Sequence, residues 1–282
     1  MKNKIPSIPK EILLCADDYA QSTAISQGIL TLVNAGRINA VSCLVNKSAF
    51  DETYADLLAC RSKCFIGLHL NLTLGQPRSA MWRSHAGELF GSLPKLICDA
   101  YLKRLDLRVV QAELQAQLDV FVDTMQCYPD FIDGHQHIHQ FPVVRDALLN
   151  IYREKNMSCF LRNTYNGLLQ SYRFSAFPKS ALLALLGGAK FKNLLIQEAI
   201  PANTSFSGVY PFARAKSYRK YFTRFLSETV TGGLIMCHPG VESRDNDDPL
   251  LYSRPEEYTY FMSDSFVQDM QTYACKLMTK KR

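Results

Sequence analysis

The sequence predicts an α/β fold: one domain whose parallel sheet takes a barrel-like or incomplete-barrel form. Short apolar runs of strand length alternate with longer segments of helical period along the 282 residues. No repeat, low-complexity tract or linker divides them, so a single domain over residues 1–282 is expected. Such alternation is typical of a parallel sheet covered by helices. About seven strand–helix units suit a complete or incomplete barrel better than a flat doubly wound sheet.

Six apolar runs have the length expected of buried strands. They lie at residues 12–16, 40–45, 65–70, 131–133, 159–162 and 233–237. Apolar residues at helical spacing predict the helices between them. These are expected at about 25–33, 110–125, 142–152 and 218–225, with one long helix over about 254–277 closing the chain.

Residues 180–196 stand out because Ala181–Leu186 is unusually apolar and is followed by Lys190 and Lys192. One interpretation is a covering helix, buried against the sheet and broken at Gly187-Gly188. The alternative is a small interfacial surface that docks a lipid-linked substrate. We expect the covering helix.

Composition argues against several classes of protein. Hydrophobic residues make up 47% of the chain and charged residues 21%, which is ordinary for a folded protein. The net charge of +6 is spread along the chain, so no nucleic-acid-binding arm is expected. No apolar stretch has the length of a membrane span. Nine cysteines without repeated Cys-x-x-Cys spacing, and an N-terminus unlike a signal peptide, favour a cytoplasmic location.

Polar residues suited to metal binding and proton transfer follow the predicted strands. In chain order they are Asp17, Asp18, His69, His135, His137, His139, Arg162 and His238. Because catalytic groups of parallel α/β domains gather where strands end, we expect these side chains to meet at one edge of the sheet.

Two imidazoles and one carboxylate are typical ligands of a catalytic divalent metal, since they leave coordination positions open. A second carboxylate can then accept a proton from the attacking water. Each residue also has a structural interpretation: the Asp pair as a helix cap, His69 as a core residue, His238 as part of a turn. The His-x-His-x-His run indicates metal binding more strongly, because alternate residues of an extended segment project the same way.

Four motifs, in order, resemble the YdjC-like carbohydrate deacetylases. They are Ala16-Asp17-Asp18-Tyr19, Gly67-Leu68-His69-Leu70-Asn71-Leu72-Thr73, Asp133-Gly134-His135-Gln136-His137-Ile138-His139 and Cys237-His238-Pro239-Gly240. The resemblance spans residues 16–240. It implies a deformed (β/α) barrel related to the polysaccharide deacetylases. It also implies hydrolysis of the N-acetyl group of an amino sugar, chitooligosaccharide-like or lipid-linked, to acetate and a free amine.

Carried over residue by residue, the resemblance implies that Asp18, His69 and His135 hold one divalent metal ion, Mg²⁺ or Zn²⁺. The first motif departs from the family's common Asp-Asp-Phe-Gly, because Tyr19 and Ala20 follow the aspartates here. The departure keeps both carboxylates but affects the shape of the neighbouring loop, and with it the choice of sugar.

The resemblance further implies that Asp17 is the general base and His238 the general acid. Arg162 lies where related deacetylases have an arginine that orients the base. Aromatic side chains that could stack on a sugar ring are Trp82, Tyr19 and Phe141.

Two other functions remain open. A different metal hydrolase, such as a phosphoesterase, would use the same ligands and needs further acidic residues for a second metal. Asp245, Asp247 and Asp248 could supply them, although we expect a solvated loop there. A non-catalytic sugar-binding protein would keep the fold, but Asp17 and His238 argue against it. The sequence does not decide the sugar, the metal, the roles of His137 and His139, or whether the chain forms a homo-oligomer.

Overall fold

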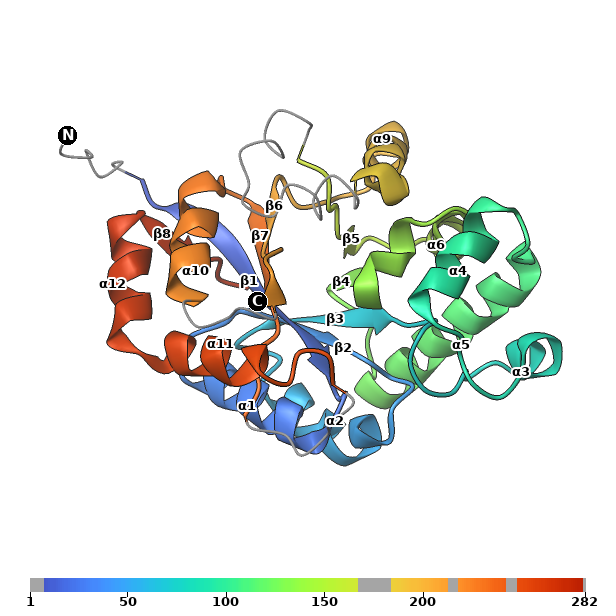
Figure 1. The fold of residues 1–282 in the computed structure, drawn as a ribbon, viewed down its shortest axis with the longest axis horizontal. Helices are drawn as coiled ribbons and strands as arrows, with labels where there is room; N and C mark the ends of the chain where they lie inside the picture. The colour runs from blue at the N-terminus through green and yellow to red at the C-terminus, as the bar shows by residue number, and fades with distance from the viewer. Residues whose placement is uncertain (1–7, 167–183, 213–217, 242–247, 281–282) are drawn as a thin grey trace.

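A computed structural model describes residues 8–166, 184–212, 218–241 and 248–280. Its centre is an eight-stranded parallel sheet in the order β5-β4-β3-β2-β1-β7-β6, with β8 paired to the start of β1 (Figure 1). The strands are β1 (Lys10–Tyr19), β2 (Ala40–Cys43), β3 (Phe65–Leu70), β4 (Phe131–Gly134), β5 (Phe160–Leu161), β6 (Phe206–Ser207), β7 (Gly233–Cys237) and β8 (Cys275–Leu277).

Helices surround the curled sheet (Figure 1). They are α1 (Thr23–Asn34), α2 (Ser48–Ala59), α3 (Ala80–Ala86), α4 (Leu93–Tyr101), α5 (Leu107–Met125), α6 (Val144–Glu154), α9 (Ala189–Gln197), α10 (Tyr218–Glu228), α11 (Ser253–Met262) and α12 (Asp264–Thr272). Two short helices of other types are η1 (His135–Gln140) and η2 (Ala184–Gly188).

The two edges of the sheet approach one another through a single segment. Leu161 of β5 forms an isolated parallel bridge with Ala202, and its N–H donates to the carbonyl oxygen of Pro201 at 2.9 Å. The same segment then continues into β6, which pairs with β7. The sheet is therefore an incomplete parallel barrel, and the predicted fold class is confirmed.

The buried apolar side chains form two groups, one on each face of the sheet. The larger group joins the outward residues of the strands, such as Leu14 and Ile235, to the helices. The smaller group fills the inside of the barrel; it consists of Leu13, Cys15, Ala40, Phe131, Phe206, Leu234 and Met236. Residues i and i+2 of a strand face the same side, which keeps the two groups separate.

The end of the chain differs from its prediction. The single helix expected over 254–277 is wrong, because α11 and α12 are separated at Ser263 and β8 follows them. Ser263 has extended backbone, with φ −78° and ψ 160°, and its side chain accepts a hydrogen bond from the N–H of Phe266. A serine in this position caps a new helix and so ends the preceding one.

Residues 180–183 of the apolar segment lie outside the described residues. Of the remainder, Leu185 is 78% exposed, whereas Phe191 and Leu195 of α9 are buried against the core. Gly187, at the expected break, has φ +99°. Helix α9 therefore packs on the core through two side chains, and whether the apolar stretch before it forms a covering helix stays a prediction. In the described part of the chain no helix combines the length and apolar character needed to cross a membrane.

Gly208, directly after β6, allows β6 and β7 to approach closely. Its φ is +115°, and a Cβ there would lie 2.1 Å from the carbonyl oxygen of Met236. We predict that Gly208→Ala lowers the free energy of unfolding by about 1–3 kcal/mol, because it combines backbone strain with a clash. The matched control is Gly36→Ala, since Gly36 also has positive φ but nothing within 4 Å. Urea unfolding of both variants should show the larger loss for Gly208→Ala; equal losses would contradict the prediction.

Candidate functional site

Alternation along the strands explains why polar side chains gather at one end of the barrel. The inner apolar group includes Cys15, Ala40, Phe131 and Met236. Because alternate residues of a strand face the same side, the next inward position lies two residues later in the chain. At these positions the residues are polar: Asp17, Ser42, Asp133 and His238. The inward positions after Phe65 and Phe160 lead in the same way to His69 and Arg162. The barrel is thus apolar at one end and polar at the carboxyl ends of its strands.

Asp17 and Asp18 both belong to the site, although neighbours in a regular strand face opposite sides. The register between β1 and β2 shifts between Ala16 and Tyr19, which marks a bulge. Within it, Asp18 has φ +64°, a left-handed conformation that aspartate tolerates better than most residues. The bulge lets two adjacent carboxylates border the same cleft.

The departure at Tyr19 and Ala20 leaves this arrangement intact. The Tyr19 side chain is buried, and its hydroxyl donates to the carbonyl oxygen of Thr53 at 2.8 Å. Ala20 has φ +68°, a left-handed conformation that glycine adopts more easily, and glycine is the common residue here in the family that the sequence resembles. Its N–H donates to Oγ of Ser26 at 2.9 Å, which holds the strained turn.

Asp18, His69 and His135 have ligand atoms that all lie within 4.8 Å of one another. Oδ1 of Asp18 is 3.4 Å from Nε2 of His69 and 2.9 Å from Nδ1 of His135. Carboxylate and imidazole atoms so spaced, with one face open to a cleft, are what a catalytic divalent metal requires. The structure thus brings the three predicted ligands together, and their role in binding metal stays a prediction.

Neighbouring groups fix the orientation of His69. Its Nδ1 lies 2.7 Å from Oδ1 of Asp133, its partner in the β3–β4 register, and 3.0 Å from Oγ of Ser42. When His69 is neutral, we assign its ring proton to Nδ1, in the bond with Asp133, which leaves the Nε2 lone pair free to bind a metal. Burial alone would lower the pKa of His69, but Asp133 and Asp18 raise it to about 10. This position therefore favours a positive charge.

The guanidinium of Arg162 is fully buried and holds Asp17 with two hydrogen bonds. Nη1 donates to Oδ2 of Asp17 and Nη2 to Oδ1, both at 2.6 Å. Nη2 also pairs with Oδ2 of Asp133. Burial would raise the pKa of the Asp133 carboxyl, but Arg162 and His69 hold it well below its usual range. A bidentate pair of this kind fixes the plane of the Asp17 carboxylate.

Arg254 of α11 is a site residue that the sequence did not indicate. It is buried, and Nη2 donates to Oδ2 of Asp18 at 2.8 Å, while Nε donates to Oδ2 of Asp248 at 2.5 Å. Oδ1 of Asp18 is then left to the two histidines. The expectation of a solvated acidic loop is wrong for Asp248, which is buried by this ion pair; Asp245 and Asp247 lie outside the described residues.

The charges of these groups do not balance. Four carboxylates and two guanidiniums form connected ion pairs; they belong to Asp17, Asp18, Asp133, Asp248, Arg162 and Arg254. When both imidazoles are neutral, as metal binding requires, two negative charges remain in a buried region, where uncompensated charge is unfavourable; protonation of His69 would leave one. The donor set and this excess of negative charge both fit a divalent cation.

His238 borders the same cleft from the end of β7. Its ring packs edge-on against Phe212 at 5.4 Å, and Nδ1 has no hydrogen-bond partner among the described residues. Burial lowers the pKa of His238 to about 4, although Asp18 and Asp17 act in the opposite direction. Its backbone N–H donates to Oε2 of buried Glu257 at 2.6 Å.

Glu257 is the second residue that the sequence did not indicate. It lies on α11, like Arg254, and Oε1 accepts a hydrogen bond from the hydroxyl of Tyr210 at 2.5 Å. Nothing in the local sequence separates its buried carboxylate from those of exposed glutamates such as Glu256. Only the packing of α11 across the strand ends brings it to the site.

The three histidines of the His-x-His-x-His run do not share one direction. The expected extended conformation is wrong, because η1 occupies these residues and Gln136 and His137 have φ of 54° and 60°. Only His135 joins the cluster around Asp18. His137 borders the cleft and packs edge-on against Phe206, and Nε2 of His139 lies 3.0 Å from the carbonyl oxygen of Arg162.

The cleft beside these groups has a volume of about 470 Å³. The aromatic residues considered for sugar stacking are buried and do not border it; they are Trp82, Tyr19 and Phe141. Phe212 is the aromatic residue that lines it among the described residues. Lys47, Gln21 and Thr73 add polar side chains to the wall.

Residues 11–272 match the family described as YdjC-like protein. The chain belongs to the YdjC-like family. A carbohydrate deacetylase of Danio rerio is 32% identical to the YdjC-like chain over 154 residues, which are 52% of this chain and 48% of the relative. A chitooligosaccharide deacetylase of Proteus mirabilis is 29% identical over 144 residues, 51% of this chain and 56% of the relative. The chain spans about half the length of these relatives.

The YdjC-like chain is also similar to a solved structure along almost its whole length. A protein of Enterococcus faecalis, described as a candidate for cellobiose-phosphate cleavage, aligns with a TM-score of 0.71 at 19% identity. The alignment covers 96% of this chain and 97% of that one. This likeness supports the curled parallel sheet as the fold of the family member described here.

We predict that Glu257→Gln gains stability relative to the unaltered protein as pH rises from about 4.5 to about 7. Burial, the largest influence, raises the pKa of Glu257 from 4.5 to about 7, despite hydrogen bonds from Tyr210 and His238. The folded state holds this proton more firmly, so the stabilisation is complete below pH 4.5 and is lost as pH rises through 7.

The difference in Tm between Glu257→Gln and the unaltered protein measures this effect. The Tm of the variant, relative to that of the unaltered protein, should rise by roughly 2–8 °C between about pH 4.5 and about pH 7. Glu256→Gln is the matched control, because Glu256 is the neighbouring residue of α11 and is exposed. A Tm difference for Glu257→Gln that does not vary with pH would refute the prediction.

Proposed function

We propose that this YdjC-like chain is a metal-dependent carbohydrate deacetylase. It would hydrolyse the N-acetyl group of an amino sugar, chitooligosaccharide-like or lipid-linked, to acetate and a free amine. One observation carries the proposal: Asp18, His69 and His135 converge next to Asp17, a second carboxylate that buried Arg162 holds in place. The activities named for the Danio rerio and Proteus mirabilis relatives support the same reaction.

Asp18, His69 and His135 would hold the metal, Mg²⁺ or Zn²⁺. When bound, the ion would supply Lewis-acid polarisation of the acetyl carbonyl and make water easier to ionise. Asp17 would accept the proton of the attacking water. Oδ1 of Asp17 accepts from Arg162 and from the thiol of Cys15, whereas Oδ2 accepts only one bond from Arg162 and has a second lone pair for this proton.

His238 would deliver a proton to the leaving nitrogen. Amide nitrogen leaves poorly unless it is protonated, so a positioned acid is needed on that side of the substrate. With a pKa of about 4, His238 starts unprotonated at neutral pH. We therefore infer that the proton taken from water by Asp17 is the one that His238 passes to nitrogen. Glu257 and Phe212 hold His238 for this transfer.

A phosphoesterase with two metals is less well supported. The other cluster of ligand-type residues in the described chain is Cys15, Asp17 and Asp133. The guanidinium of Arg162 already binds these groups, and Asp248 is paired with Arg254. Little is left to hold a second ion.

A cytoplasmic location remains part of the proposal. All nine cysteines are free, and six of them are buried: Cys15, Cys43, Cys60, Cys64, Cys237 and Cys275. Free cysteines in this number are typical of a reducing compartment.

We predict that the metal-loaded chain releases acetate from at least one member of a panel of N-acetylated chitooligosaccharides and lipid-linked amino sugars. His69→Ala and His135→Ala should each lose most of the bound metal and nearly all acetate release, because each removes one ligand. Metal content is measured by elemental analysis and acetate by a coupled assay. If both variants keep stoichiometric metal, the ligands are wrongly assigned.

We further predict that the two adjacent aspartates respond differently to the same change. Asp18→Asn should weaken metal binding, since an amide is a poorer ligand than a carboxylate. Asp17→Asn should keep the metal but lose about 10²–10⁴-fold in kcat, because the amide cannot accept the proton from water. Near-normal turnover in metal-loaded Asp17→Asn would exclude Asp17 as the base.

A further inference from the structure

The proposed reaction leaves His137 of the histidine run without a role. This residue borders the catalytic cleft, although only 8% of it is exposed. Its ring packs edge-on against Phe206 of the inner apolar group at 5.4 Å, and edge-on against His139 at 6.4 Å. Two ring contacts therefore fix the plane of an imidazole in the wall of the cleft.

The two ring nitrogens of His137 differ in their surroundings. Nδ1 is buried and has no hydrogen-bond partner among the described residues. Nε2 also has no partner among them, but it is not buried, so it is the nitrogen that the cleft can reach. A proton on Nδ1 would be a buried donor without an acceptor, which is rarer in proteins than an unpaired acceptor. The ring proton therefore belongs on Nε2, where it faces the cleft.

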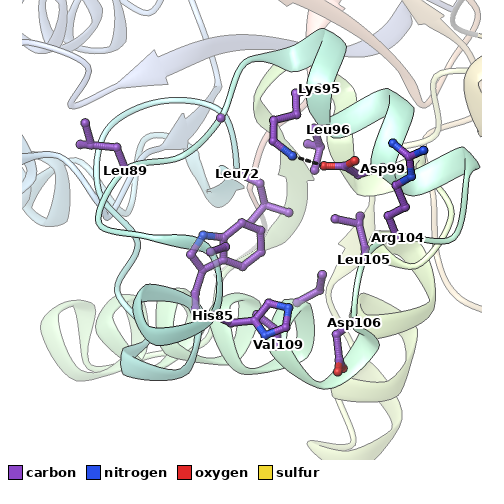
Figure 2. A pocket seen from close by; sticks show the side chains of 14 residues that line it. Leu72, His85, Leu89, Lys95, Leu96, Asp99, Arg104, Leu105, Asp106 and Val109 are labelled. Carbon is purple, nitrogen blue, oxygen red and sulfur yellow. Dashed lines mark hydrogen bonds and ion pairs between the residues drawn. The ribbon is translucent and has the colours of Figure 1, made fainter.

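The backbone that presents this ring is strained. Gln136 and His137 both have positive φ, 54° and 60°, which is uncommon outside glycine and costly in two successive residues. Thr73 holds the turn, since its Oγ1 donates to Oε1 of Gln136 at 2.8 Å. The loop of Thr73 is itself anchored, because Leu72 is buried in the wall of a hollow between α3, α4 and α5 (Figure 2). Strain that the neighbouring structure maintains in this way is typical of functional positions.

The wall around His137 suits an acetyl group. Phe206, which the ring contacts, belongs to the inner apolar group together with Met236, and Val209 packs against that group. Met236 and Val209 also line the cleft. An apolar surface beside a hydrogen-bond donor matches the methyl group and the carbonyl oxygen of an acetamide.

The proposed reaction also needs such a donor. When water attacks an acetamide, negative charge develops on the carbonyl oxygen. This charge develops beside Asp17 and Asp18, in a region that is already rich in carboxylates. A donor held in advance at the place of the oxygen offsets the charge, and histidine is one of the side chains that enzymes use for this purpose.

We propose that Nε2–H of His137 donates a hydrogen bond to the carbonyl oxygen of the substrate's acetyl group and stabilises the negative charge that develops there. The inference rests on the proposed function, because it assigns one more group of the same site. In this role His137 transfers no proton, which distinguishes it from Asp17 and His238. The methyl group of the same acetyl lies against Met236 and Val209.

Two amide substitutions separate the donor from the strained backbone. Asparagine adopts positive φ more readily than glutamine, but its amide reaches only to the place of the buried Nδ1. The longer glutamine carries its amide to the place of Nε2. We expect His137→Asn to lose about 10²–10³-fold in kcat with little change in KM, because the donor acts on the transition state. His137→Gln should keep a kcat at least about 10-fold above that of His137→Asn.

The order of the two variants decides the proposal. If His137→Asn equals or exceeds His137→Gln in kcat, the residue acts through its backbone and the proposal is wrong. A rise in KM with unchanged kcat would overturn it too, because the contact would then be with the bound sugar before reaction. Both variants should hold as much metal as the unaltered protein. Loss of metal from His137→Asn would instead make His137 a ligand.

NMR of the unaltered chain with isotope-labelled histidine tests the same contact without turnover. The ring proton of His137 should be found on Nε2, and its signals are identified by their absence from His137→Gln. Acetate, which carries the oxygens of the product, should shift the Nε2 resonance of His137. A proton on Nδ1, or an Nε2 resonance that acetate leaves unchanged, would overturn the inference. Because neither observation needs acetate release, this inference and the proposed reaction can fail separately.

Discussion

The guanidinium of Arg162 lies fully buried between the carboxylates of Asp17 and Asp133, and the geometry of the site depends on this contact. The three groups come from the ends of different strands, so the strands must stay aligned for the charges to remain paired. Removing one partner of a buried ion pair costs about 3–5 kcal/mol. Through Asp133 the same contact orients His69, and the carbonyl oxygen of Arg162 in turn lies within hydrogen-bond distance of His139. One buried cation thus positions both the proposed base and a proposed ligand.

Helix α11 completes the arrangement from the other side. Arg254 donates a hydrogen bond to Oδ2 of Asp18, and Glu257 accepts one from the backbone N–H of His238. The proposed metal ligand and the proposed acid are therefore both held by residues of one helix, packed across the ends of β1 and β7. The excess of negative charge that remains gives a physical reason for a divalent cation, independent of any likeness to other proteins.

Local signals in the sequence were sufficient for six of the eight strands, all but β6 and β8, and for the polar residues at their ends. Their place at the ends of the predicted strands led to Asp17, His69 and His238, and the fold followed from the alternation of strands and helices. Arg254 and Glu257 could not be predicted, because on a helix of mixed polarity only tertiary packing decides which polar residues are buried. The predicted conformation of the histidine run was wrong for a similar reason. Gln136 and His137 have positive φ, and in residues other than glycine the local sequence does not indicate such a conformation.

Anomalous diffraction from crystals of the protein soaked with Mn²⁺ or Zn²⁺ tests the central claim most directly, because it locates the ion without reference to activity. The account predicts one strong anomalous peak in contact with Asp18, His69 and His135, with Asp17 still bound by Arg162. A peak at His137 or His139 instead, or no peak in crystals whose cleft is open to solvent, would contradict it.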